Sequence, residues 1–244
     1  MTRLLFTLLC FMTAGCSSMQ TRVMWPAREL ALVPGAAIGL RRPNGETAVV
    51  VNTQTVQKLL LAHFRITRTA NVQAELIFYD GEEPNAFAAI VNERRMIAVN
   101  TGMIKLIGDD IDQYAALLGH ETAHWAEGHV DQGSTRSKTI QAIGTALGVG
   151  LGAAGVPGAG YITGFGADLI EAAYSRDDER EADALGIDYM IANSFDPGAA
   201  VRLHEKMLKL NDRLRIPFLS SHPSSQERIE SLKKLIEQKQ RASR

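Results

Sequence analysis

Hydrophobic residues recur every three or four positions in five segments of the chain, a spacing that predicts helices with one buried face. The segments are 53–64, the stretch after Asp109 and Asp110, 168–192, 197–210, and a last helix through 229–236. The apolar face of the first segment consists of Val56, Leu59, Leu60 and Phe64. We therefore expect most of the folded chain to be helical.

Capping residues predict where three of these helices begin. The acidic pair before the second segment places negative charge at a helix N-terminus, where the helix dipole favours it. Asp196 and Pro197 predict an N-cap and the first residue of the fourth helix. Ser224 and Glu227, three residues apart, predict a capping box at the start of the last helix.

Two stretches have the pattern of strands instead. Glu75–Tyr79 is a short run of strand-forming residues, which predicts a buried strand. After a turn over 80–84, the apolar runs Ala86–Val91 and 96–99 are separated by four polar residues, which predicts a hairpin on a small sheet. The fold class that follows is α+β, mainly helical with a small β-sheet.

One long segment, 139–167, has no charged residue and contains nine glycines. Its length would fit a membrane span, but the glycines and Pro157 argue against one continuous helix. We expect two small-residue helices packed in the core around a turn at Pro157. The alternative is contact with a membrane or an apolar substrate.

The N-terminus has the layout of an export signal. Arg3 precedes an apolar run over 4–12, and small residues lead to Cys16. This end resembles a bacterial lipobox, although Thr13 stands where leucine is usual. We expect a lipoprotein signal peptide over 1–15, a tether over 16–35 and one domain over 36–240. A lipidated Cys16 would anchor the chain without spanning the membrane, and Ser17 in place of aspartate favours the outer membrane.

Composition narrows the functional classes. The 244 residues are 45% hydrophobic and 22% charged, which is ordinary for a globular domain. With 26 basic and 27 acidic residues and no long run of one sign, the sequence argues against a nucleic-acid partner. The two cysteines are Cys10 and Cys16. The mature chain would have no disulfide, so its stability must come from its core and a bound metal.

Candidate chemistry lies at 117–130, which holds three of the six histidines. His120 and His124 are four residues apart, so they differ by about 40° around a helix and can approach one ion. Glu121 would lie beside the ion without binding it, where a carboxylate can take a proton from a zinc-bound water. His129 is five residues past His124, and helical geometry turns it away from the pair. We expect His129 to be incidental.

A catalytic zinc site usually has three protein ligands, and spacing alone does not identify the third. The densest source of candidates is the acidic stretch 177–183. Glu179 and Asp183 share a helix face, so one of them could bind the metal while the other orients a ligand imidazole. His63, His204 and His222 are the remaining histidines.

The H-E-x-x-H motif at 120–124, combined with Glu179-x-x-Ala182-Asp183, resembles the M48 family of zinc metallopeptidases. The resemblance covers the chain from about Glu75 onwards and implies a zincin-like domain with one zinc ion. It assigns His120, His124 and Glu179 as zinc ligands. It also assigns Glu121 as the general base and Asp183 as a supporting residue.

Two further features fit the resemblance. The segments 85–88, with Asn85, Ala86 and Phe87, and 97–102 are similar to the family's hairpin, whose edge strand faces the active-site cleft and pairs with substrate. His222-Pro223 is similar to a loop that, in some members, holds the enzyme latent through a histidine at the open position of the zinc. We therefore expect His222 to be a regulatory fourth ligand.

Within the family, the periplasmic, lipid-anchored members resemble this chain most. This resemblance implies that the protein hydrolyses misfolded or misassembled envelope proteins on the periplasmic side of the outer membrane. One alternative is a zinc-containing holdase or assembly factor that cleaves little. Another is a membrane-associated adaptor that uses the glycine-rich segment. The intact Glu121 favours the enzyme, because a structural zinc site needs no carboxylate beside the metal.

Overall fold

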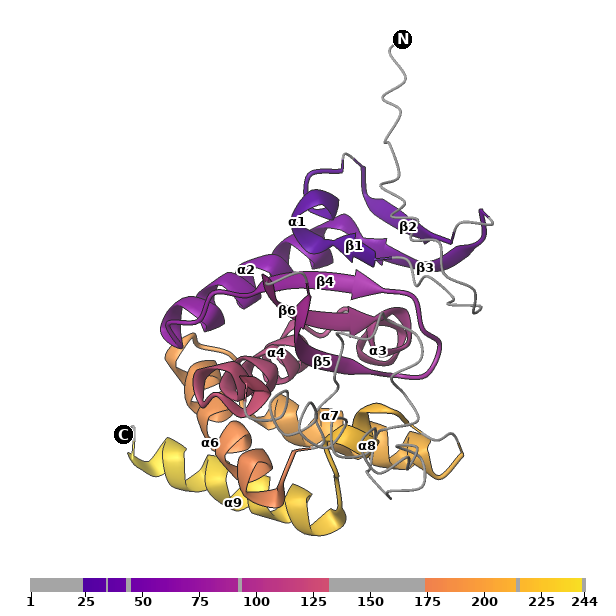
Figure 1. The fold of residues 1–244 in the computed structure, drawn as a ribbon. Coiled ribbons are helices and arrows are strands. Elements are labelled where there is room, and N and C mark those ends of the chain that lie inside the picture. The colour runs from indigo at the N-terminus through magenta and orange to yellow at the C-terminus, as the bar shows by residue number, and fades with distance from the viewer. Residues whose placement is uncertain are drawn as a thin grey trace, which may run out of the picture.

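The computed structural model describes residues 24–33, 35–42, 45–91, 94–131, 174–213 and 216–242. Strands gather at one end of the described chain and most of the helices at the other (Figure 1). The expected signal peptide, Cys16 and the glycine-rich segment 139–167 lie outside the described residues. The expectation of a mainly helical α+β domain is confirmed.

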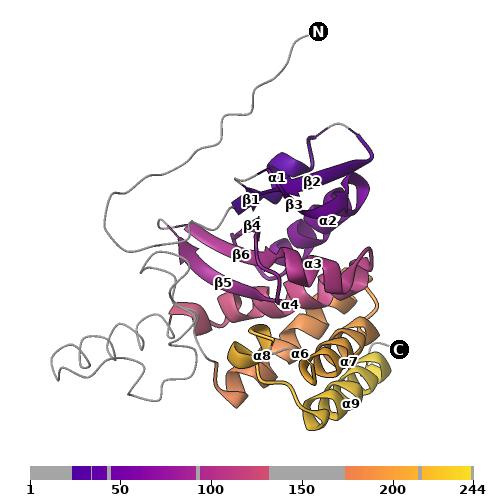
Figure 2. The ribbon, with the colours of Figure 1, turned by 90° about the vertical axis from the view of Figure 1, so that its right-hand side faces the viewer.

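The larger sheet has four strands in the order β1-β4-β6-β5. They are β1 (Met24–Pro26), β4 (Glu75–Tyr79), β5 (Ala86–Val91) and β6 (Arg94–Asn100). The predicted hairpin is confirmed, since β5 pairs with β6 antiparallel and Phe87 lies opposite Ala98. β6 also runs parallel to β4. β5 is therefore an edge strand, and it lies on the side of the sheet nearest the helices (Figures 1 and 2).

The tether predicted over 16–35 is wrong for its last part. Met24–Pro26 pairs with Ile77–Tyr79, and the short helix α1 (Ala27–Leu30) follows immediately. Ala27 is fully buried and Trp25 packs against the main core. Burial of these apolar side chains is favourable, and a solvated linker would leave them exposed to water. The domain therefore begins before residue 36.

A second sheet was not predicted. It consists of β2 (Ala37–Arg41) and β3 (Thr47–Asn52), paired antiparallel. β2 alternates exposed and buried positions along its length, with Ile38 and Leu40 in the core. Only two positions of this short strand are buried, so its apolar signal is weak.

The five predicted helices are present with altered bounds, as α2 (Thr53–Thr69), α4 (Ile111–Ala126), α6 (Arg176–Ala192), α7 (Gly198–Asn211) and α9 (Gln226–Ala242). Two short helices, α3 (Thr101–Ile107) and α8 (Phe218–Ser221), were not predicted. The apolar face expected on α2 needs one correction, because Phe64 is 58% exposed and the buried face continues through Ile66 instead. None of the helices in the described residues combines the length and apolar character that a bilayer span needs.

Two of the three predicted helix starts differ from the prediction. For α4, Asp110 accepts the amide N–H of Gln113 at 3.1 Å, as predicted. α7 begins one residue later than predicted, with Pro197 at the N-cap position, and Asp196 accepts the amide N–H of Gly198 at 2.9 Å. For α9 the predicted cap, Ser224, is wrong by one residue. Ser225 accepts the amide N–H of Arg228 at 3.1 Å, because the Ser224 hydroxyl is hydrogen-bonded to His204 instead.

Helix α4 is the centre of the domain. It packs against α2, α6 and α7 on its sides and against β5 of the sheet. Figure 2 shows α4 between the sheet and the helices α6 to α9. Thirteen consecutive residues of α4, from Gln113 to Trp125, are buried. The H-E-x-x-H motif therefore lies on a helix that is covered on all sides.

Candidate metal centre

Helices α4 and α6 approach each other at a pair of glycines beside the motif. A Cβ atom built on Gly186 would lie 3.0 Å from the backbone nitrogen of His120. A Cβ atom on Gly119 would lie 3.0 Å from the carbonyl oxygen of Gly186. The missing side chains let the two backbones touch, which brings the α6 carboxylates to the imidazoles of α4.

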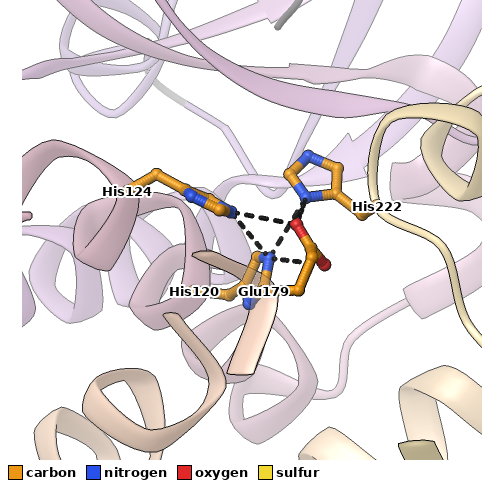
Figure 3. Close-up of side chains that lie close together, drawn as sticks. All are labelled: His120, His124, Glu179 and His222. Atoms are coloured by element: carbon orange, nitrogen blue, oxygen red, sulfur yellow. Dashed lines mark hydrogen bonds and ion pairs between the residues drawn. The ribbon is translucent and has the colours of Figure 1, made fainter. Parts of the chain in front are cut away.

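Four buried side chains converge on one point, as Figure 3 shows. His120 and His124 come from α4, Glu179 from α6, and His222 from the loop after α8. Each offers one ligand atom, and these four atoms lie within 4.8 Å of one another. The Nε2 atoms of His120 and His124 are 3.1 Å apart, and Nδ1 of His222 is 2.9 Å from Oε1 of Glu179.

The donor set fits a zinc ion. Imidazole nitrogens and a carboxylate oxygen are ordinary zinc ligands, and catalytic sites typically use three of them. The ring of His120 directs Nδ1 to a carboxylate and Nε2 to the point of convergence. A ligand histidine usually has this arrangement, because the outer hydrogen bond leaves the inner nitrogen with its lone pair free.

Electrostatics also favour a cation at this point. Burial alone would lower the pKa of His120, but the charge of Glu179 and the hydrogen bond to Asp183 outweigh burial and raise the pKa to about 10. Burial, followed by repulsion from the neighbouring imidazoles, keeps the pKa of His124 well below its ordinary value. Binding of a divalent metal at this point would therefore compete with a proton on His120.

Asp183 contacts one of the candidate ligands, His120. Oδ1 of Asp183 lies 3.1 Å from Nδ1 of His120. Arg228 of α9 binds the same carboxylate with two hydrogen bonds, at 2.7 and 2.8 Å. Burial would raise the pKa of Asp183, but the Arg228 guanidinium and His120 hold it well below its ordinary value. Asp183 is therefore a charged acceptor for His120.

Arg228 was not predicted as a site residue, although it contacts more of the site than any other residue that the sequence analysis missed. Its Nη1 donates both to Oε2 of Glu179 and, at 2.9 Å, to the carbonyl oxygen of Pro223. One guanidinium thus contacts a candidate ligand, the residue that orients another ligand, and the loop that carries His222. In the sequence, Arg228 is one charged position on an amphipathic helix, and nothing distinguishes it from a solvated residue.

The expectation that helical geometry turns His129 away from the pair is wrong. Its Nδ1 lies 3.0 Å from Nδ1 of His124, and its Nε2 lies 3.3 Å from Oε2 of Glu181. Helical geometry misplaced this residue because α4 ends at Ala126 and Gly128 has a φ of 71°, which a glycine adopts readily. The chain turns there and directs His129 back to the site.

His222 and Glu121 lie next to each other inside the site. Nε2 of His222 is 3.5 Å from Oε1 of Glu121, and neither side chain has exposed surface. Phe218 stacks on the His222 ring with centroids 4.4 Å apart, and Tyr174 stacks on the His124 ring at 3.6 Å. The two aromatic rings were not predicted, because a single aromatic residue near a loop carries no distinctive sequence signal.

The predicted residues of the hairpin contact other parts of the sheet. Asn85 donates its backbone N–H to the Asn100 side chain at 2.9 Å, and Phe87 packs on Tyr79 with ring centroids 5.4 Å apart. Both side chains are buried. The structure thus places these residues at the start of the edge strand β5.

Known proteins are similar to this chain over much of its length. The family model for peptidase family M48 matches residues 51–236. Metalloprotease LoiP of Escherichia coli K12 is 26% identical over 155 residues, which is 64% of this chain and 60% of that protein. Mitochondrial metalloendopeptidase OMA1 of Schizosaccharomyces pombe is 28% identical over 191 residues, or 77% of this chain and 54% of that one. Metalloprotease YcaL of E. coli K12 is 27% identical over 140 residues, 57% of this chain and 54% of YcaL. The chain thus matches between half and two thirds of the length of these relatives.

Proposed function

Because the chain belongs to peptidase family M48, we propose that it is a zinc-dependent endopeptidase. The observation that carries the proposal is the convergence of His120, His124 and Glu179 on one point with Glu121 beside it. Zinc bound to these three ligands would supply a Lewis acid for the scissile carbonyl and lower the pKa of a water molecule.

Glu121 would move the protons of the reaction. In the sequence it lies on α4 between the two ligand histidines. Its Oε1 is 3.5 Å from Nε2 of His222, so Glu121 lies beside the place that His222 occupies. A carboxylate at this position can accept a proton from the attacking water and then donate it to the departing amine. Glu121 is fully buried, which strengthens its electrostatic interactions with the reacting groups.

The edge strand β5 would hold the substrate. Among the described strands, β5 pairs only with β6, and α4 packs close to it. An extended polypeptide can add to such an edge through backbone hydrogen bonds, largely independent of its sequence. This mode suits substrates that are unfolded, because only an unfolded segment can extend along the strand next to the metal.

His222 would keep the site latent. Its Nδ1 lies 3.2 Å from Nε2 of His120 and 2.9 Å from Glu179, so it would be a fourth ligand where three suffice for catalysis. Its other nitrogen faces Glu121. A substrate carbonyl needs this position, so the loop that carries His222 must move before cleavage begins.

The proposed setting is the periplasmic face of the outer membrane, with misfolded or misassembled envelope proteins as substrates. The export signal and the Cys16 lipobox support this location, and the lipid on Cys16 would be the contact with the membrane. Labelling of cells with a radioactive fatty acid tests the anchor. Wild-type protein should incorporate the label and a Cys16→Ser variant should not, whereas equal labelling would refute the anchor.

Cleavage of an unfolded outer-membrane protein by zinc-loaded enzyme tests the activity. We expect wild-type cleavage to be slow, His222→Ala to be faster, and His222→Ala combined with Glu121→Gln to cleave at least about 1,000-fold more slowly than His222→Ala alone. Zinc content should be the same for the last two proteins. Equal cleavage by both would refute the role of Glu121. Binding of the unfolded protein without cleavage, even by His222→Ala, would favour a holdase.

A further inference from the structure

We propose that Glu181 and His129 are positioning residues that hold His124 in the tautomer able to bind the metal. This inference rests on the zinc site proposed above and adds two residues to it. The three groups form a chain that runs from the surface of α6 to the point where the ligands converge.

The geometry of the chain is continuous. Oε2 of Glu181 lies 3.3 Å from Nε2 of His129, and Nδ1 of His129 lies 3.0 Å from Nδ1 of His124. The His129 side chain is 4% exposed, whereas that of Glu181 is 54% exposed. The carboxylate at the outer end therefore reaches solvent, and the imidazole in the middle does not.

The order of donors follows from the carboxylate at the end. An ionised carboxylate only accepts hydrogen bonds, so Nε2 of His129 must donate to Glu181. Nδ1 of neutral His129 then has a lone pair and accepts the N–H of His124 Nδ1. This leaves Nε2 of His124 without a proton and directed at the other ligands. The opposite tautomer of His124 would direct an N–H at the metal and prevent binding.

Asp178 is a second carboxylate near His129. Its Oδ1 lies 3.8 Å from Nε2 of His129, which is too long for a hydrogen bond, and its Oδ2 accepts the backbone N–H of Ser175 at 2.9 Å as part of the capping box. Glu181 is therefore the closer acceptor for His129.

The two ligand histidines of α4 are thus oriented by two separate sets of hydrogen bonds, called arms below. Asp183 orients His120, and His129 with Glu181 orients His124. Outer hydrogen bonds of this kind typically change metal affinity by 10- to 100-fold when they are removed. Helix α6 supplies the carboxylates of both arms as well as the ligand Glu179.

The test is the zinc affinity of the full chain, measured by competition with a fluorescent chelator. We expect His129→Phe and Glu181→Ala each to bind zinc about 10- to 100-fold more weakly than wild type. His129→Asn should recover most of the affinity, because its amide oxygen can accept the N–H of His124 where Nδ1 did. Asp177→Asn is the matched control, since this exposed carboxylate of α6 pairs with Arg180 at 2.9 Å, and its affinity should equal that of wild type.

A spectroscopic readout separates orientation from simple packing. In a proton spectrum of the zinc-loaded protein, the Nδ1–H of His124 should be shifted far downfield by its hydrogen bond, and His129→Phe should abolish that shift. Because the Glu181 side chain is exposed, Glu181→Ala should keep the fold. Its zinc affinity therefore tests the inference even if His129→Phe does not fold. Wild-type affinity in Glu181→Ala would overturn the inference. A wild-type chain that binds no zinc would overturn the proposed function instead.

Discussion

Arg228→Met should destabilise the protein strongly, because Arg228 neutralises two buried carboxylates. Its side chain is 11% exposed, and those of Asp183 and Glu179 are 10% and 5% exposed. Removing one partner of a buried ion pair leaves an uncompensated charge, which costs about 3–5 kcal/mol. Exposed ion pairs contribute less than about 1 kcal/mol by contrast. We therefore expect the free energy of unfolding of the metal-free protein to fall by about 4 kcal/mol.

Urea denaturation measures this loss directly. With a urea slope of about 3 kcal/mol per molar, 4 kcal/mol shifts the midpoint by about 1.3 M. Arg180→Met is the matched control. Arg180 lies 2.9 Å from Asp177, close to the 2.7 Å between Arg228 and Asp183, but the side chains of Arg180 and Asp177 are mostly exposed. The control should shift the midpoint by less than about 0.3 M.

A double-mutant cycle identifies the interaction responsible. Arg228→Met and Asp183→Asn should each be destabilising, and the double variant should be less destabilised than their sum by at least about 2 kcal/mol. An additive cycle, or a loss below about 1 kcal/mol in Arg228→Met, would contradict the reasoning. The same charges make stability depend on acid: the pKa of Asp183 is depressed, so its contribution is present above about pH 4 and is lost below it.

Three further outcomes can be checked with the same methods. Gly186→Ala should cost about 1–3 kcal/mol and weaken zinc binding, because its Cβ would press on the backbone at His120; a variant with wild-type stability and affinity would contradict this. The pKa of His120 is raised to about 10, so in zinc-free protein its contribution is complete below about pH 6.5 and is lost as pH rises through 10. Stability should therefore fall over that range more steeply than in His120→Asn, and parallel curves would show the sign to be wrong. Ser225→Ala should lower stability by about 1 kcal/mol through the lost cap of α9, as seen in its urea midpoint against wild type; an unchanged midpoint would argue against the cap.

The parts of the fold that depend on local order were predictable. Regular apolar spacing and capping residues identified α4, α6 and the β5–β6 hairpin, because these signals lie within a few residues of each other. The strands β1, β2 and β3 were missed for two reasons. β1 has three residues and depends on β4, a partner that is distant in sequence. β2 pairs with its neighbour β3, but few of its positions are buried, so its apolar signal is weak.

The site was predictable only in part. Two histidines on one helix turn can be recognised from spacing, but Glu179 is 55 residues beyond His124, and helical geometry could not choose it from its acidic neighbours. The family resemblance supplied that choice. Arg228 and His129 were missed for different reasons: the first looks like any surface charge, and the second follows a helix end that only the backbone at Gly128 reveals.

The contact between Gly119 and Gly186 also sets a lower limit on the size of the metal site. Because the backbones of α4 and α6 already touch there, the turn that carries His120 cannot move closer to the helix that carries Glu179. Side chains can adapt to an ion by rotating, but two touching backbones cannot. The selectivity of this chain for one ionic radius over another would thus depend partly on two residues that have no side chain and bind nothing.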